Sequence, residues 1–133
     1  MTIHLNAVGD ISAAVRRVTA HVADRVSLSE EREFSIKLVL NELLANCFEH
    51  ANTGRATVIY RLDEPVLKCC IMDGGNGFAR QEGYRASCPC AGSESGRGIF
   101  LARNLSQLLR YNRKGNAVMV RILVELGEKK ENS

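Results

Sequence analysis

The alternation of hydrophobic and polar positions predicts one strand and one helix at the start of the chain. Ile3, Leu5 and Ala7 alternate with polar neighbours, which predicts a short strand over residues 2–8 at the edge of a sheet. Helical spacing then runs from about residue 10 to residue 26, with Asp10 as the expected N-cap. One face of this helix is apolar and consists of Ile11, Val15, Val18, Val22 and Val26.

A second, longer helix is predicted from Ser27 to about Ala51. Ser27 and Glu30 have the spacing of a capping box, and the end falls at residues 52–54, which tolerate left-handed geometry. Glu42 and Asn46 are four residues apart, so we expect them to stack at the border of the apolar stripe and to point into a cleft. That stripe is formed by Ile36, Leu40, Leu43, Leu44, Cys47 and Ala51. A solvated helix flank shows the same pattern, so the pair alone does not define a function.

Strand-like patterns follow this helix. Residues 55–62 alternate in polarity, and Val66–Met72 is a nearly continuous apolar run that is typical of a central strand. The turn over residues 63–65 is short, so these two strands should be antiparallel neighbours. Residues 73–98 hold most of the chain's 11 glycines and predict a long functional loop.

A third helix and a final hairpin complete the expected order of elements. The helix is predicted from Ile99, Leu101, Ala102, Leu105, Leu108 and Leu109. The hairpin is expected to pair residues 111–113 with 117–125 around a turn at Lys114-Gly115-Asn116. This order predicts an α+β fold, a two-layer sandwich with a mostly antiparallel mixed sheet and three main helices on one face.

Size and composition fit one domain over residues 1–133 with a polar tail at 128–133. The chain is 45% hydrophobic and carries a net charge of only +3, with basic and acidic residues interspersed. We therefore expect no nucleic-acid partner and no membrane association. The first residues lack the pattern of a secretory signal, so the expected location is cytoplasmic.

The 5 cysteines cannot all be paired within one chain, and we expect them to be reduced and mostly structural. Cys69 and Cys70 are adjacent in a predicted strand, so their side chains should point to opposite faces. Cys88 and Cys90 lie in the glycine-rich loop, where a metal or redox role stays open, although the spacing does not supply a full zinc site.

Two glycine segments have chemistry suited to a nucleotide. Asp73-Gly74-Gly75-Asn76-Gly77-Phe78 begins at a strand end, where a carboxylate can accept a hydrogen bond from the amino group of a base. Ser95-Gly96-Arg97-Gly98 precedes the predicted third helix, where backbone N–H groups and an arginine can bind phosphate. A plain turn and a flexible capping segment would use the same residue types. The spacing matches neither the dinucleotide-binding fingerprint nor the P-loop.

Taken in order, three segments resemble the N, G1 and G2 boxes of the GHKL ATPase superfamily, which has the Bergerat fold. They are Asn41–Ala51, Asp73–Phe78 and Gly96–Ala102. More narrowly, nearly the whole chain is similar to the anti-sigma-factor serine/threonine kinases. One departure is Gly115-Asn116, where that family usually has Gly-Thr, which leaves one nucleotide contact in doubt.

The resemblance implies a role for each matched residue. Asn46 would ligate the Mg²⁺ that bridges the ATP phosphates, and Asp73 would accept from the adenine amino group. Gly77 would shape the pocket beneath the base and Gly75 would also bind the nucleotide, whereas Gly96, Arg97 and Gly98 would contact phosphates. Residues 79–95 would form the ATP lid. Glu42 would be the general base that accepts the proton of a serine or threonine hydroxyl.

The function expected from the resemblance is an ATP- and Mg²⁺-dependent serine/threonine protein kinase and anti-sigma regulatory factor. Its substrate would be an anti-sigma-factor antagonist of the STAS type, a sigma factor would be a further partner, and the kinase would act as a homodimer. One alternative is a nucleotide-dependent protein-binding regulator without phosphotransfer. The other is a detached catalytic domain of the histidine-kinase type. Glu42 favours the kinase over the binding module, because binding alone requires no base there.

Overall fold

The computed structural model describes residues 1–50, 54–73, 102, 104–112 and 116–124. The elements are β1 (Thr2–Leu5), a 3₁₀ turn η1 (Val8–Asp10), α1 (Ile11–Arg25), α2 (Glu30–His50), β2 (Ala56–Asp63), β3 (Val66–Asp73), β4 (Leu108–Tyr111) and β5 (Ala117–Leu123). The glycine-rich segment, the expected lid at 79–95, Cys88, Cys90 and the tail at 128–133 lie outside the described residues.

The five described strands form one sheet in the order β1-β2-β3-β5-β4. All four of their pairings are antiparallel, so the expected mixed sheet is antiparallel throughout the part that the structure describes. The predicted edge position of β1, the central position of β3 and the β2–β3 hairpin are confirmed. The α+β prediction is confirmed as well.

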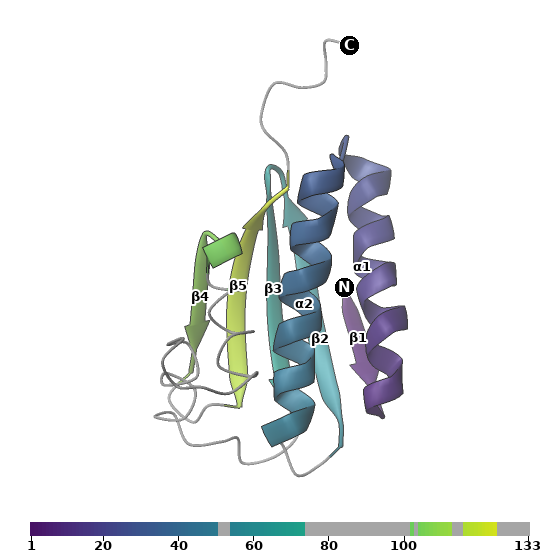
Figure 1. Ribbon diagram of the computed structural model, residues 1–133, viewed down its shortest axis with the longest axis vertical. Coiled ribbons are helices and arrows are strands. Elements are labelled where there is room, and N and C mark those ends of the chain that lie inside the picture. Colours follow the sequence, from purple (N-terminus) through teal and green to yellow (C-terminus); the bar gives the residue numbers. More distant parts are fainter. Residues whose placement is uncertain (51–53, 74–101, 103, 113–115, 125–133) are drawn as a thin grey trace.

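Helices α1 and α2 lie side by side over one face of the sheet (Figure 1). Strand residues that alternate along the chain point toward these helices and are buried, for example Val58, Ile71 and Val118, which are paired across three strands. The helices meet them with their own apolar faces, including Val18 of α1 and Leu40 of α2. The side chains between the two helices and this face of the sheet form the hydrophobic core.

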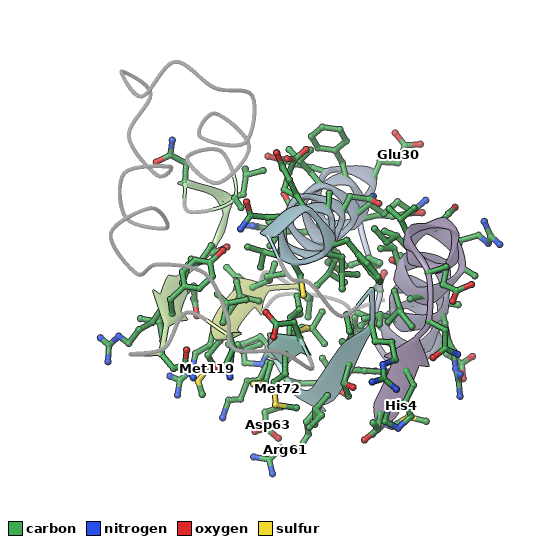
Figure 2. The ribbon with its side chains drawn as sticks, turned by 90° about the horizontal axis from the view of Figure 1, so that it is seen from below. His4, Glu30, Arg61, Asp63, Met72 and Met119 are labelled. Carbon is green, nitrogen blue, oxygen red and sulfur yellow. The ribbon has the colours of Figure 1, made fainter. Side chains whose placement is uncertain are left out.

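The opposite face of the sheet carries a different set of side chains. Arg61, Asp63, Met72 and Met119 point away from the two helices (Figure 2). Asp63 forms salt bridges with Arg61 and Lys68 at 2.7 and 2.9 Å, and these contacts lower the pKa of its carboxyl. Cys69 is buried and Cys70 is half-buried, which confirms that the two thiols point to opposite faces. No helix among the described residues is long and apolar enough to cross a membrane.

The apolar face predicted for the first helix is confirmed, since all five of its residues are buried. Asp10 occupies the N-cap position, but its side chain makes no capping hydrogen bond to the helix. Instead, Asp10 Oδ2 accepts from the backbone N–H of Asn6 at 2.9 Å, which fixes the chain between β1 and α1.

The start of the second helix differs from the prediction. Helix α2 begins at Glu30, and Ser29 rather than Ser27 caps it, because Ser29 Oγ accepts from the backbone N–H of Arg32 at 3.1 Å. Two serines two residues apart offer the same capping chemistry, so the sequence alone did not distinguish them. Gly54, after the helix, has φ of 70°, as expected for a residue in left-handed geometry.

The predicted third helix was extended too far toward its C-terminus. Ala102, Asn104 and Leu105 are helical, but Leu108 and Leu109 belong to strand β4. Leu109 is buried against the core and pairs with Val120 of β5. A short apolar run fits either a helix or a strand, and pairing with β5 decided the outcome.

Candidate nucleotide-binding site

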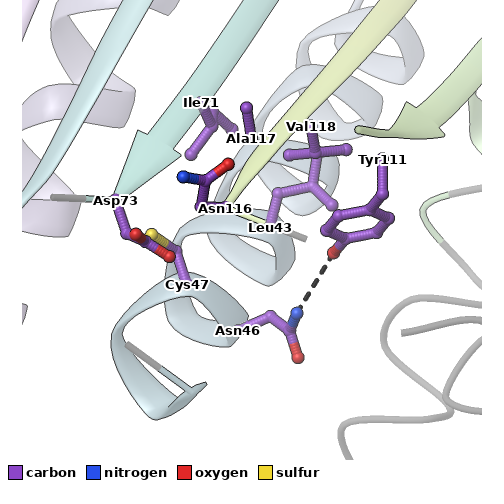
Figure 3. A pocket seen from close by; sticks show the side chains of 9 residues that line it. All are labelled: Leu43, Asn46, Cys47, Ile71, Asp73, Tyr111, Asn116, Ala117 and Val118. Atoms are coloured by element: carbon purple, nitrogen blue, oxygen red, sulfur yellow. Dashed lines mark hydrogen bonds between the residues drawn. The ribbon is translucent and has the colours of Figure 1, made fainter. Parts of the chain in front are cut away.

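A small pocket opens where α2 ends and three strands of the sheet come together (Figure 3). Its wall combines apolar side chains with the polar side chains of Asn46, Asp73 and Asn116. The lining residues are Leu43, Asn46, Cys47, Ile71, Asp73, Tyr111, Asn116, Ala117 and Val118.

Antiparallel pairing brings these distant segments together at one end of the strands. Strand β3 ends at Asp73, and β5 begins beside it because Met72 pairs with Ala117. Strand β4 also ends here, with its last residue, Tyr111, paired with Val118 of β5. Helix α2 supplies the remaining wall through residues one turn apart, which lie on the same face of the helix.

Asn46 has the most informative environment in the pocket. The residue is only 4% exposed, so it belongs to the buried face of α2 and not to the border of the stripe as predicted. Its Nδ2 donates a hydrogen bond to the hydroxyl of Tyr111 at 3.1 Å. Its Oδ1 is buried and has no hydrogen-bond partner among the described residues. A buried carbonyl oxygen without a partner is costly, which points to a ligand that supplies one.

Asp73 lies at the pocket edge with its carboxylate near the thiol of Cys47 (Figure 3). Burial, with a further contribution from the charge of Asp73, raises the pKa of Cys47 to about 12. The thiol therefore stays protonated at neutral pH, and Cys47 is a neutral wall of the pocket and not a nucleophile.

The turn between β4 and β5 is tied to this edge by hydrogen bonds. Asn112 Oδ1 accepts from the backbone N–H groups of Asn116 and Ala117 at 3.1 and 3.2 Å. Asn112 Nδ2 donates to Asn116 Oδ1 at 2.7 Å, and the backbone N–H of Asp73 donates to the carbonyl of Asn116 at 3.0 Å. The end of β3 and the turn are thus held together through the backbone.

The structure brings two of the predicted site residues, Asn46 and Asp73, into the same pocket. Glu42 is half-buried one helical turn before Asn46, but it does not line the pocket. Gly75, Gly77, Gly96, Arg97 and Gly98 lie outside the described residues.

Among the lining residues with polar or ionisable side chains, sequence reasoning missed Cys47, Tyr111 and Asn116. Cys47 was assigned to the apolar stripe and Tyr111 to the start of a hairpin, and neither position carries a local signal for a ligand. Asn116 was noted only as a departure from Gly-Thr. Its place on the pocket wall gives that departure a physical meaning, because a carboxamide offers both a donor and an acceptor.

The residues present fit both parts of a magnesium–nucleotide complex. Mg²⁺ prefers oxygen ligands and usually takes only one or two from the protein, with phosphates and water supplying the rest. The single partnerless Oδ1 of Asn46 meets that requirement, and the described residues contain no cluster of three or more His, Cys, Asp or Glu that would form a complete protein cage. Asp73 offers an acceptor beside an apolar wall, as recognition of an amino-bearing base requires.

Comparison with known proteins supports this interpretation. No curated protein matches the chain. A family model described as the histidine kinase-like ATPase domain matches residues 7–122 and so covers all of the pocket. Because the match spans most of the chain, this protein belongs to the histidine kinase-like ATPase domain family and is an ATP-binding domain of that kind.

Proposed function

We propose that this ATP-binding domain is a Mg²⁺-dependent protein serine/threonine kinase of the anti-sigma type. Its substrate is a hydroxyl of an anti-sigma-factor antagonist of the STAS type. The observation that carries the proposal is the alignment on α2 of a half-buried carboxylate, Glu42, one turn before the Asn46 oxygen that no described residue partners. A domain that only bound nucleotide would need the second group but not the first.

In this proposal, some residues bind the nucleotide and another accepts a proton. Asp73 accepts from the amino group of the base, and Asn46 supplies one oxygen to Mg²⁺. When bound, the ion neutralises charge on the phosphates. Glu42, half-buried one helical turn before Asn46, accepts the proton of the incoming hydroxyl.

The proposed partners are a STAS-type antagonist and a sigma factor that the same domain sequesters. The domain itself is proposed to form a homodimer. Light scattering on purified protein tests the last point, and a monomer at tens of micromolar would remove the homodimer from the proposal. Location in the cytoplasm follows from partners of this kind.

The decisive experiment is transfer of radiolabel from ATP to a candidate STAS-type protein encoded beside this chain. Glu42→Gln should retain ATP binding and lose transfer by two or more orders of magnitude, on the scale of about 10²–10⁴ for a general base. Glu33→Gln is the matched control, because it makes the same change on the same helix at an exposed ion pair with Lys37. Normal transfer by the Glu42 variant would refute its role as the base.

One observation favours a second function, a nucleotide-dependent binding regulator without phosphotransfer. Among the described residues that line the pocket, Glu42 is absent, which places its carboxylate outside the nucleotide-binding wall. Absence of label on the partner, combined with ATP-dependent complex formation, would establish this alternative. Label that is lost in acid but retained in alkali would instead indicate phosphohistidine and the histidine-kinase type.

A further inference from the structure

The two ends of the Asn46 carboxamide have opposite environments. Nδ2 is hydrogen-bonded to the Tyr111 hydroxyl at 3.1 Å, whereas Oδ1 has no partner among the described residues. Because the amide is one rigid plane, whatever holds the nitrogen also decides where the oxygen points. Figure 3 shows this arrangement, with the amide reaching Tyr111 from α2.

We propose that Tyr111 is a positioning residue that orients Asn46 for the divalent cation of the nucleotide complex. The tyrosine hydroxyl accepts from Nδ2 and so keeps Oδ1 free for the metal. This inference rests on the proposed assignment of Asn46 as the Mg²⁺ ligand. It assigns a function to a pocket residue that lies 65 positions from Asn46 in the chain and acts on the metal only through Asn46.

The chemistry of the amide explains why orientation matters. The terminal torsion of asparagine is soft and close to twofold, so an unsupported amide samples both orientations. In the reversed orientation the NH₂ group replaces Oδ1, and an amide nitrogen with two hydrogens cannot ligate Mg²⁺. Tyr111 is suited to prevent this reversal because the residue is only 8% exposed and its backbone pairs with Val118 inside the sheet.

The test is Tyr111→Phe in the full chain, with ATP affinity measured by calorimetry across a Mg²⁺ titration and again in EDTA. We expect ATP binding in EDTA to change less than about twofold. The enhancement of affinity by Mg²⁺ should fall about three- to tenfold, the effect of losing one neutral hydrogen bond. Near-ultraviolet circular dichroism confirms that the variant is folded. Tyr60→Phe is the matched control, since it removes another buried tyrosine's hydroxyl, which contacts His21 far from the pocket.

A second background separates positioning from a general structural effect. In Asn46→Asp the two carboxylate oxygens are equivalent, so orientation no longer matters. Adding Tyr111→Phe to that background should leave the Mg²⁺ enhancement unchanged, whereas a merely structural role of Tyr111 would lower it in both backgrounds.

The outcomes are distinguishable. A Mg²⁺ enhancement that Tyr111→Phe leaves intact overturns the inference alone. An enhancement that rises overturns it too, because the hydroxyl would then be competing with the metal for Oδ1. ATP affinity in the wild-type protein that is indifferent to Mg²⁺ overturns the metal assignment of Asn46 together with the inference.

Discussion

The contact between Asn46 and Tyr111 predicts a variant that loses its ligand while its fold gains stability. The perturbation is the double substitution Asn46→Leu, Tyr111→Phe. Leucine has nearly the shape of asparagine, so the pair becomes apolar with little change in packing. Both polar partners disappear together, which avoids leaving one of them buried alone.

The magnitude follows from two opposing terms. Removing Oδ1, which has no partner in the described part of the chain, recovers about 1–3 kcal/mol of desolvation free energy, and removing the hydrogen bond loses about 1 kcal/mol. The free energy of unfolding of the protein without nucleotide should therefore rise by between roughly 0 and 2 kcal/mol. Binding of ATP in Mg²⁺ should fall to the level measured in EDTA.

Urea denaturation followed by circular dichroism measures the first quantity and calorimetry the second. The single variant Asn46→Leu is the comparison, because it leaves the Tyr111 hydroxyl without this partner and should be less stable than the double variant. A double variant less stable than the wild-type protein by more than about 1 kcal/mol would refute the reasoning, since Oδ1 would then be satisfied in the free protein.

Three further predictions concern the fold. Ser29→Ala should lower the free energy of unfolding by about 0.5–2 kcal/mol through loss of the α2 cap, whereas Ser27→Ala should change it little, and equal effects would contradict the cap assignment. Leu67→Ala in the central strand should cost about 2–5 kcal/mol, against less than about 1 kcal/mol for Met119→Ala on the face opposite the two helices, where 47% of the residue is exposed. The pKa of Cys47 is raised from 9.0 to about 12 on folding, so its contribution to stability is complete below pH 9 and is lost as the pH rises further. Between pH 9 and 10 the loss should be about 1 kcal/mol, and Cys47→Ala should reduce the slope in alkaline urea titrations.

Periodicity predicted the parts of the fold in which burial repeats locally. The face of α1 and the alternation in β2 depend only on neighbouring residues, because one side of each element meets the core. The run from Ile99 to Leu109 was misassigned at its end because apolar content alone does not distinguish a helix from a strand. Pairing of Leu109 with Val120, a contact between distant segments, decided it.

In the site, too, residues with a local sequence signal could be predicted and residues placed by distant contacts could not. Asn46 and Asp73 stood out because each lies in a segment with a recognisable motif, and the structure places both on one pocket wall. Tyr111 had no such signal, since its relation to Asn46 depends on how far β4 runs back along β5. The burial of Asn46 was also mispredicted, because a polar residue beside an apolar stripe gives no indication that a tyrosine will cover it.

The bond between the backbone amide of Asp73 and the carbonyl of Asn116 has a consequence for hydrogen exchange. This amide hydrogen exchanges with solvent only when the end of β3 and the β4–β5 turn separate. A residue whose side chain is expected to meet the base therefore reports, through its main chain, on the opening of a neighbouring hairpin. Hydrogen exchange at this one amide, followed by mass spectrometry or NMR, would therefore measure how often the end of β3 and the β4–β5 turn separate. Slower exchange with nucleotide present would measure how strongly the ligand holds these two segments together.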